Sequence, residues 1–265
     1  MRTISVLLRH EMKQGAKALM IWSGAIGFFL VICVFMYPEM RGEMDGVSEL
    51  FASMGAFSAA FGMDRLDFGT LIGFYAVECG SIIGIGGAFF AAFTAVSALA
   101  NEEKEHTAEF LLSHPVRRTE ILTGKLLAVV LRIVILNVFS FGCAVVSSAL
   151  IGEAIPAKEL LLLHTACFIM QLELGGICFG ISAFLRRGSA GIGLGLAAVM
   201  YFLNITANLS DDAAFLNYIT PFGYTDGADI LTDGALNMHL ILPGLFYMII
   251  GIVTAYLHYT RKDIT

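Results

Sequence analysis

Two acidic side chains and one amide interrupt apolar stretches of this sequence. Glu173 and Gln171 lie near the middle of an apolar run at 160–185, and Glu78 lies near the outer end of another at 76–100. An ionised carboxylate at the centre of a membrane span costs about 2.5–3.5 kcal/mol on insertion scales, so Glu173 must face protein or water, or hold a proton. These three residues are therefore candidates for a translocation path, and Glu173 is also a candidate proton-binding site. The structural alternative for Glu173 is an interhelical hydrogen bond or a pair with another span.

The other polar residues and the glycines in the apolar runs are better explained by packing between helices than by catalysis or ligand binding. We expect the amides of Asn137, Asn204 and Asn208 to form hydrogen bonds between helices. Arg132, about two turns into its apolar run, is expected to extend toward the lipid headgroups, as long basic side chains do near the ends of spans. Pairs of glycines four residues apart predict close helix approach at Gly80–Gly84, Gly176–Gly180 and Gly191–Gly195.

No motif of an enzyme active site is present in the sequence. A phosphate-binding loop of the form G-x-x-x-x-G-K-[ST] is missing; the nearest stretch, 119–125, lacks the first glycine and is followed by Leu126. A zinc-protease helix and a G-x-S-x-G nucleophile turn are missing as well. The five cysteines lie in apolar runs without metal-type or disulfide-type spacing. We therefore predict no catalytic residue, no metal site and no ATP binding by this chain alone.

The composition is typical of an integral membrane protein. Of the 265 residues, 57% are apolar and only 14% are charged. An ordinary soluble domain is about one quarter charged. A chain of this size with so few charged residues has too little polar surface to cover a water-soluble globule, which excludes that class.

Six apolar runs are long enough to cross a bilayer, which takes about 20 residues at about 1.5 Å each. They lie at 19–37, 76–100, 126–150, 160–185, 189–208 and 239–259. Residues 1–18 precede the first run with basic residues on one helix face and apolar residues on another. We expect this stretch to be an amphipathic helix in the membrane interface, the alternative being a solvated leader. The chain is thus predicted to be a single all-α transmembrane domain over 1–265.

Basic residues indicate which side of the membrane each segment faces. With the N-terminus inside, twelve of the 16 Lys and Arg residues fall on the inner side, three on the outer side and one, Arg132, within a span. Both termini and the stretch 101–125 are therefore predicted to be cytoplasmic. The outer segment 209–238 holds five aspartates and no Lys or Arg, and we interpret it as a solvated acidic loop rather than a calcium site.

The stretch 101–125 is the longest polar interruption with mixed charges between two apolar runs. On a helix, Glu102 and Glu109 share one face, while Thr107, Leu111 and Leu112 share the opposite face. The proline at 115 disfavours a helical conformation just before it and suits the first turn of a new helix. The pattern predicts two short helices and a corner at the membrane surface, the second helix leading into the run at 126–150.

The same stretch resembles the membrane subunits of type-2 ATP-binding-cassette exporters, the class that includes bacitracin, lantibiotic and sodium exporters. The matching positions are Glu102, Thr107, Glu109, Leu111, Leu112, Ser113, Pro115, Val116, Arg118, Ile121 and Lys125. One departure is His106, where a glycine is often found. Two further stretches are similar to that class, 221–230 before the last span and 259–264 at the C-terminal end.

The resemblance implies a permease subunit that works with a separate ATPase. It implies a cytoplasmic coupling helix after the second span, two permease copies, identical or paralogous, and two ATPase copies in a bacterial cell membrane. ATP and Mg²⁺ would then be bound by the ATPase, with no cofactor on this chain and no nucleic-acid partner. The resemblance assigns ATPase coupling to Glu102, Glu103, Thr107, Glu109, Leu111, Leu112, Pro115, Arg118 and Lys125.

A different class of function stays open at this point. Glu173 in the fourth run is also compatible with an ion- or proton-coupled secondary transporter, which needs no ATPase. Such carriers are commonly built from repeated halves, and the sequence shows no such repeat. The resemblance of the segment 101–125 to type-2 permeases, together with the lack of a repeat, favours the exporter subunit over the secondary transporter.

Overall fold

The computed structural model describes residues 2–41, 53–55, 58, 61–63, 65–99, 117–185 and 190–261. All regular elements in these ranges are helical. In chain order they are α1 (Arg2–Arg41), α4 (Leu71–Phe74), the π-helical turn η1 (Tyr75–Cys79), α5 (Gly80–Val96), α8 (Arg118–Leu150), α9 (Ala157–Ser182), α10 (Ala190–Leu209), the 3-10 helix η2 (Asp211–Tyr218), α11 (Gly227–Asp233) and α12 (Met238–Arg261).

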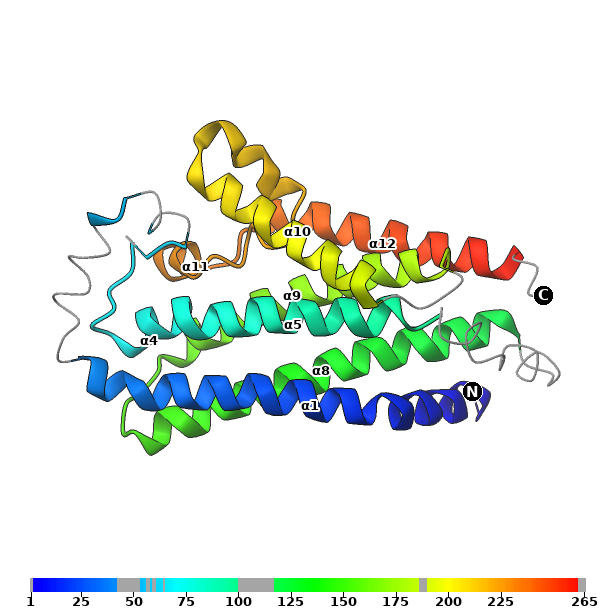
Figure 1. The fold of residues 1–265 in the computed structure, drawn as a ribbon, viewed down its shortest axis with the longest axis horizontal. Helices are drawn as coiled ribbons and strands as arrows, with labels where there is room; N and C mark the ends of the chain where they lie inside the picture. The colour runs from blue at the N-terminus through cyan, green and yellow to red at the C-terminus, as the bar shows by residue number, and fades with distance from the viewer. Residues whose placement is uncertain are drawn as a thin grey trace.

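Within the described ranges, six helical stretches are long and apolar enough to cross a membrane. They are α1, α4 to α5 taken together, α8, α9, α10 and α12. Each of the six predicted apolar runs falls on one of them, so the prediction of an all-α chain with six candidate spans is confirmed. The first described residues of α1 and the last of α12 lie at one end of the molecule, called here the terminal end (Figure 1). The opposite end holds α4 and α11.

The first helix is longer than predicted. It runs without a break over 40 residues from Arg2 to Arg41, so the expected separate helix at 1–18 is absent as an element of its own. At about 1.5 Å per residue it is about 60 Å long, twice the thickness of the hydrocarbon layer. Its first turns contact α8, with Leu7 packed against Gly124. The two helices lie side by side over most of their length (Figure 1).

The helix that leads into the third span is also continuous. α8 begins at Arg118 and ends at Leu150, so the predicted second short helix is the first two turns of α8 rather than a separate element. At its start the backbone N–H of Arg117 donates to Glu120 Oε2 at 3.1 Å, and the backbone N–H of Glu120 donates to the carbonyl of Arg117 at 2.9 Å.

α9 is the central helix of the bundle and packs against α5, α8 and α12. Its contact with α12 depends on glycine, because the backbones meet directly. A Cβ placed on Gly180 would lie 2.6 Å from the carbonyl oxygen of Gly251, and one on Gly251 would lie 2.7 Å from that of Gly176. The prediction of close approach at Gly176–Gly180 is confirmed. It is wrong at Gly84, where a Cβ would meet no atom within 4 Å.

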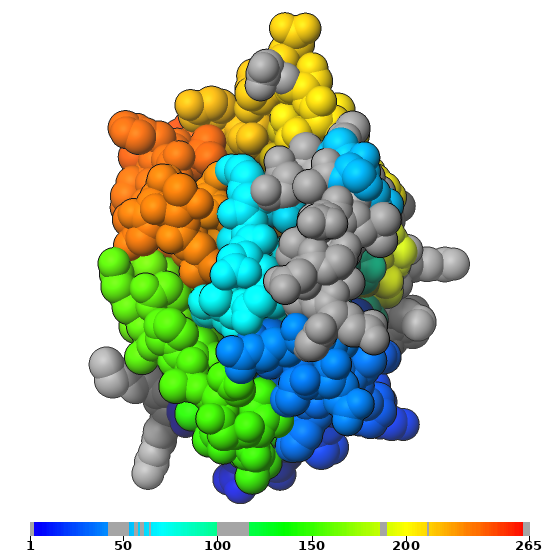
Figure 2. Space-filling model, turned by 90° about the vertical axis from the view of Figure 1, so that its left-hand side faces the viewer, coloured from blue at the N-terminus to red at the C-terminus, as the bar shows by residue number. Residues whose placement is uncertain are grey.

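The opposite end of the molecule is closed by short elements between the spans. Tyr37 of α1, Phe68, Leu71, Phe74 and Val77 form a small apolar cluster there. Figure 2 shows this end, with the cyan segment around α4 lying between the orange α11 and the green and blue ends of α8 and α1.

Candidate functional site

A cluster of charged side chains joins α1 to α8 near the terminal end. The ammonium group of Lys125 donates to Glu11 Oε1 at 2.7 Å, and both side chains are nearly buried, with 6% and 13% of their surface exposed. Arg132 donates to the backbone carbonyl of Glu11 and lies 4.0 Å from its carboxylate. Gly15 provides the space, because a Cβ there would overlap the Arg132 guanidinium. Arg132 is 8% exposed, so the prediction that it extends to the headgroups is wrong.

A second contact at this end joins α8 to α12. The guanidinium of Arg118 donates to the backbone carbonyls of Tyr259 at 3.4 Å and Thr260 at 3.3 Å. These carbonyls belong to the last turn of α12, where helix carbonyls have no partner within the helix. Arg118 therefore caps α12 and holds its end against the start of α8.

Some of the residues for which the resemblance implies ATPase coupling take part in these contacts. Glu102, Glu103, Thr107, Glu109, Leu111, Leu112 and Pro115 lie outside the described residues. Arg118 and Lys125 are described, and both are engaged with other helices of this chain. The structure therefore places them where they tie α1, α8 and α12 together, at the end of the predicted coupling region 101–125.

Gln171 lies at the junction of α5, α8 and α9 and is fully buried. Its Oε1 accepts a hydrogen bond from Asn137 Nδ2 of α8 at 2.7 Å, and its Nε2 donates to the carbonyl of Ile83 in α5 at 3.3 Å. The prediction that Asn137 bonds between helices is confirmed. These contacts make Gln171 a tie between three spans.

Glu173 faces the other side of α9, toward α12 and the loop before α11. It has no exposed surface, and its Oε2 accepts a hydrogen bond from the Tyr224 hydroxyl at 2.7 Å. Its Oε1 is buried and has no hydrogen-bond partner among the described residues. Gly244 of α12 leaves the space for the carboxylate, since a Cβ there would overlap it. Glu78 is half-buried in the π-helical turn at the start of the second span.

The structure also shows a buried pair that the sequence analysis missed. The hydroxyl of Tyr75 in η1 and Nε2 of His164 in α9 lie 2.8 Å apart, and His164 Nδ1 is buried without a partner among the described residues. The sequence did hold a signal for it, because His164 is a polar residue inside the apolar run at 160–185. The partner was hidden because a π-helical turn shifts which residues face inward.

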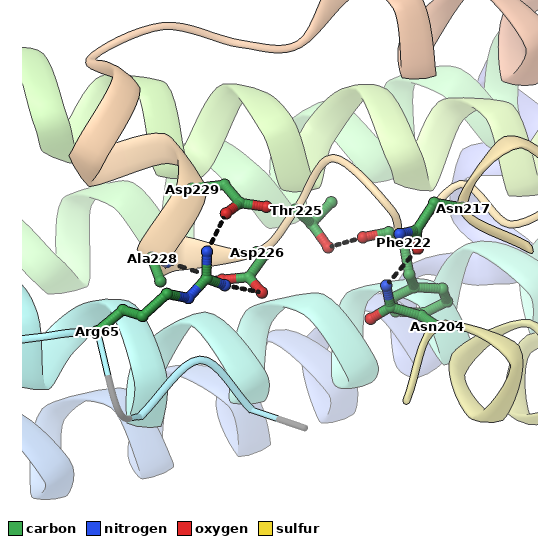
Figure 3. A network of polar contacts seen from close by, with 8 residues as sticks. All are labelled: Arg65, Asn204, Asn217, Phe222, Thr225, Asp226, Ala228 and Asp229. Atoms are coloured by element: carbon green, nitrogen blue, oxygen red, sulfur yellow. Dashed lines mark hydrogen bonds and ion pairs between the residues drawn. The ribbon is translucent and has the colours of Figure 1, made fainter. Parts of the chain in front are cut away.

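The segment after α10 is far less solvated than predicted. Thr220, Phe222 and Tyr224 are 2–3% exposed, so the acidic segment at 209–238 holds a buried portion. Figure 3 shows the polar contacts around it: Arg65 pairs with Asp226 at 3.2 Å and with Asp229 at 2.5 Å. Burial raises the pKa of the Asp226 carboxyl, and Asp229 adds to the rise by repulsion. This carboxyl also caps α11 by accepting from the N–H of Ala228 at 2.8 Å.

The described residues offer no cluster of three or more His, Cys, Asp or Glu side chains that suits a metal ion. Two aspartates of the acidic segment, Asp226 and Asp229, instead pair with Arg65, and Asp226 also caps α11. The five cysteines are free thiols within or between the spans.

Six apolar helices with polar ties between them define a multi-pass membrane protein. The comparison with protein families then identifies its class. The chain belongs to the family described as ABC-2 family transporter protein, whose model matches residues 5–264. The resemblance to type-2 permeases is thereby confirmed, and the chain is a permease component of an ABC transporter. Family membership does not favour the secondary-transporter alternative. No curated protein matched the chain.

Proposed function

We propose that this chain is the membrane-spanning permease subunit of an ATP-driven exporter and that a separate ATPase subunit drives it. The observation that carries the proposal is the extent of the family match, 5–264, which includes all six spans and the polar segment between the second and the third. The sequence supports the division of labour, since it holds no phosphate-binding loop. ATP and Mg²⁺ would accordingly bind the ATPase.

The proposed orientation places the terminal end in the cytoplasm of a bacterial cell. The excess of Lys and Arg at that side supports it. The first turns of α1 and α8, held together by Glu11 and Lys125, would then extend beyond the hydrocarbon layer toward the cytoplasm. The acidic segment with α11 would face outward.

We place ATPase coupling at the segment 101–125. Its acidic and apolar helix faces suit a groove on a partner protein, and it is joined directly to α8. Arg118 and Lys125 would act as positioning residues, because they link the start of α8 to α12 and α1. A movement of the segment would therefore reach three spans at once. We propose two permease copies and two ATPase copies for the assembly.

The proposed translocation path lies beside α9. Glu173 and Glu78 are acidic groups within candidate spans, and residues of this kind commonly mark pathways through a membrane. Gln171 supports the path by fixing α9 to α5 and α8.

Reversing two charges in the coupling segment tests this proposal. We expect Glu102→Lys together with Glu109→Lys to weaken ATPase binding on the order of tenfold or more, because the acidic face would repel its partner surface. Expression and detergent stability of the permease should be unchanged. The measurements are co-purification of the ATPase from native membranes and ATP hydrolysis by the purified complex.

The matched control reverses two exposed charges at the opposite end, Asp212→Lys together with Asp233→Lys. It should leave ATPase binding intact. Normal co-purification and normal hydrolysis in the Glu102/Glu109 variant would contradict the coupling role of the segment.

A further inference from the structure

The loop 219–226, between η2 and α11, is inserted among the spans instead of lying on the surface. Thr220 Oγ1 donates to the carbonyl of Met200 in α10 at 2.7 Å, and the ring of Phe222 packs edge-on against Tyr201 with the centroids 5.4 Å apart. Tyr224 then reaches Glu173 of α9. Loops normally run over the surface because their backbone groups need water. This one therefore depends on a few specific anchors to stay in place.

The anchor at Tyr224 differs from the others because it ends on an ionisable group. Thr220 is held by a backbone carbonyl, and Phe222 is held by apolar packing. Tyr224 is held by a carboxyl group with no exposed surface and a single hydrogen bond. The second carboxyl oxygen has no hydrogen-bond partner within the described part of the chain, although an ionised carboxylate accepts several hydrogen bonds when it is buried.

Among the described residues, no Lys, Arg or His side chain forms an ion pair with Glu173, and the Tyr224 hydroxyl is the group that bonds its carboxyl. α12 presents only its backbone to the carboxyl, at Gly244. An unpaired charge in such a site costs several kcal/mol. The arrangement therefore fits a carboxylic acid that holds its proton while the loop is inserted.

We propose that Glu173 is a proton-binding site that latches the loop 219–226 between the spans. With the proton bound, the neutral carboxyl accepts a hydrogen bond from the Tyr224 hydroxyl, and the loop stays inserted. When the loop leaves, water reaches Glu173, the O–H bond breaks, and the proton passes to that water. The proposal rests on the proposed function only in assigning the loop to the outer gate of an exporter, where opening would release a proton.

The pH dependence follows from proton linkage. The inserted state binds one proton more than the open state, so raising the pH favours opening. At a pH high enough for Glu173 to lose its proton in the inserted state as well, both states are deprotonated. A further rise in pH then no longer changes the open population through Glu173. Below the ordinary range of an exposed carboxyl, both states are protonated and the latch is insensitive to pH.

Hydrogen–deuterium exchange of the backbone amides in 219–226 measures the latch directly. The full chain is used in nanodiscs, and each variant is compared with wild type at the same pH, from about pH 5 to about pH 9. Glu173→Gln keeps a neutral acceptor for Tyr224 and cannot ionise. We expect it to match wild type at acid pH and to exchange at least about tenfold more slowly at alkaline pH.

Two further variants separate the proton from the hydrogen bond. Tyr224→Phe should exchange about fivefold faster than wild type at acid pH, since one buried hydrogen bond is lost. Thr220→Val removes a different anchor of the same loop. It should exchange faster at every pH while keeping the wild-type pH dependence. A constant ratio between wild type and Glu173→Gln at all pH values would overturn the proposal and leave Glu173 with a structural role.

A spectroscopic readout covers the case in which Glu173→Gln does not fold. Infrared spectra of the wild-type chain at neutral pH should contain the carbonyl band of a buried, protonated carboxylic acid, and Tyr224→Phe should shift that band. A spectrum without such a band would overturn the proposal. Both experiments use the permease without its ATPase, so their failure is distinguishable from failure of the exporter function.

Discussion

Gly180→Ala and Gly251→Ala are each expected to lower the melting temperature of the permease by about 2–12 °C. The backbones of α9 and α12 touch here, and the new Cβ atoms would lie 2.6 and 2.7 Å from carbonyl oxygens of the facing helix. Backbone cannot turn aside as a flexible side chain does, so the two helices must separate along their contact. Overpacking of this kind typically costs about 1–3 kcal/mol or more, and about 2–4 °C follows from each kcal/mol in a chain of this size.

Thermal unfolding in detergent, followed by size-exclusion chromatography after heating, measures the effect. Gly195→Ala is the matched control, because a Cβ on that α10 glycine meets no atom within 4 Å. Its melting temperature should be unchanged or slightly higher, since alanine favours a helix over glycine by about 1 kcal/mol. Equal stability of the Gly180, Gly251 and Gly195 variants would show that α9 and α12 do not meet at these glycines.

Glu11→Gln is expected to destabilise the contact between α1 and α8 by about 3–5 kcal/mol. The substitution removes the carboxylate that pairs with the nearly buried Lys125 and lies 4.0 Å from Arg132. Adding Lys125→Met should restore at least half of the loss, because the ammonium group that has lost its ion pair with Glu11 is then replaced by an apolar side chain. The melting temperatures of the two single variants and the double variant form a cycle that measures the coupling.

An exposed ion pair at the other end of the same helices provides the control. Arg41 Nη1 lies 2.6 Å from Glu153 Oε1, but 55% and 36% of the two side chains are exposed. Arg41→Gln should therefore change stability by no more than about 1 kcal/mol. If Glu11→Gln were as mild as Arg41→Gln, or if Lys125→Met brought no recovery, the charge cluster would not hold α1 to α8.

The sequence predicted the parts of this structure that depend on local composition. The spans follow from apolar length, and the interhelical hydrogen bond of Asn137 follows from the tendency of amides in spans to bond across helices, although its partner Gln171 was not identified. The approach of α9 to α12 was indicated by Gly176 and Gly180, although the partner at Gly251 was not identified. These features depend on residue type and on spacing within one helix.

Features that depend on distant partners were missed. The sequence indicates that Glu173 must face protein or water, or hold a proton. Its partner Tyr224, however, lies 51 positions later, in a segment interpreted as a solvated loop. The composition of that loop, with Pro221, Phe222 and Tyr224, was a signal for burial that the nearby aspartates hid. The continuity of α1 was not predicted either, because the change from an amphipathic to an apolar pattern near residue 18 does not by itself show whether the helix is interrupted there.

The central claim is that this permease works with a separate ATPase, and a pull-down tests it most directly. The tagged chain is purified from its native membrane in a gentle detergent, the co-purifying proteins are identified, and ATP hydrolysis is assayed. We expect a stoichiometric ATPase with a phosphate-binding loop, which is lost when residues 102–112 are scrambled. A chain that purifies alone, without ATPase activity, would contradict the proposed function.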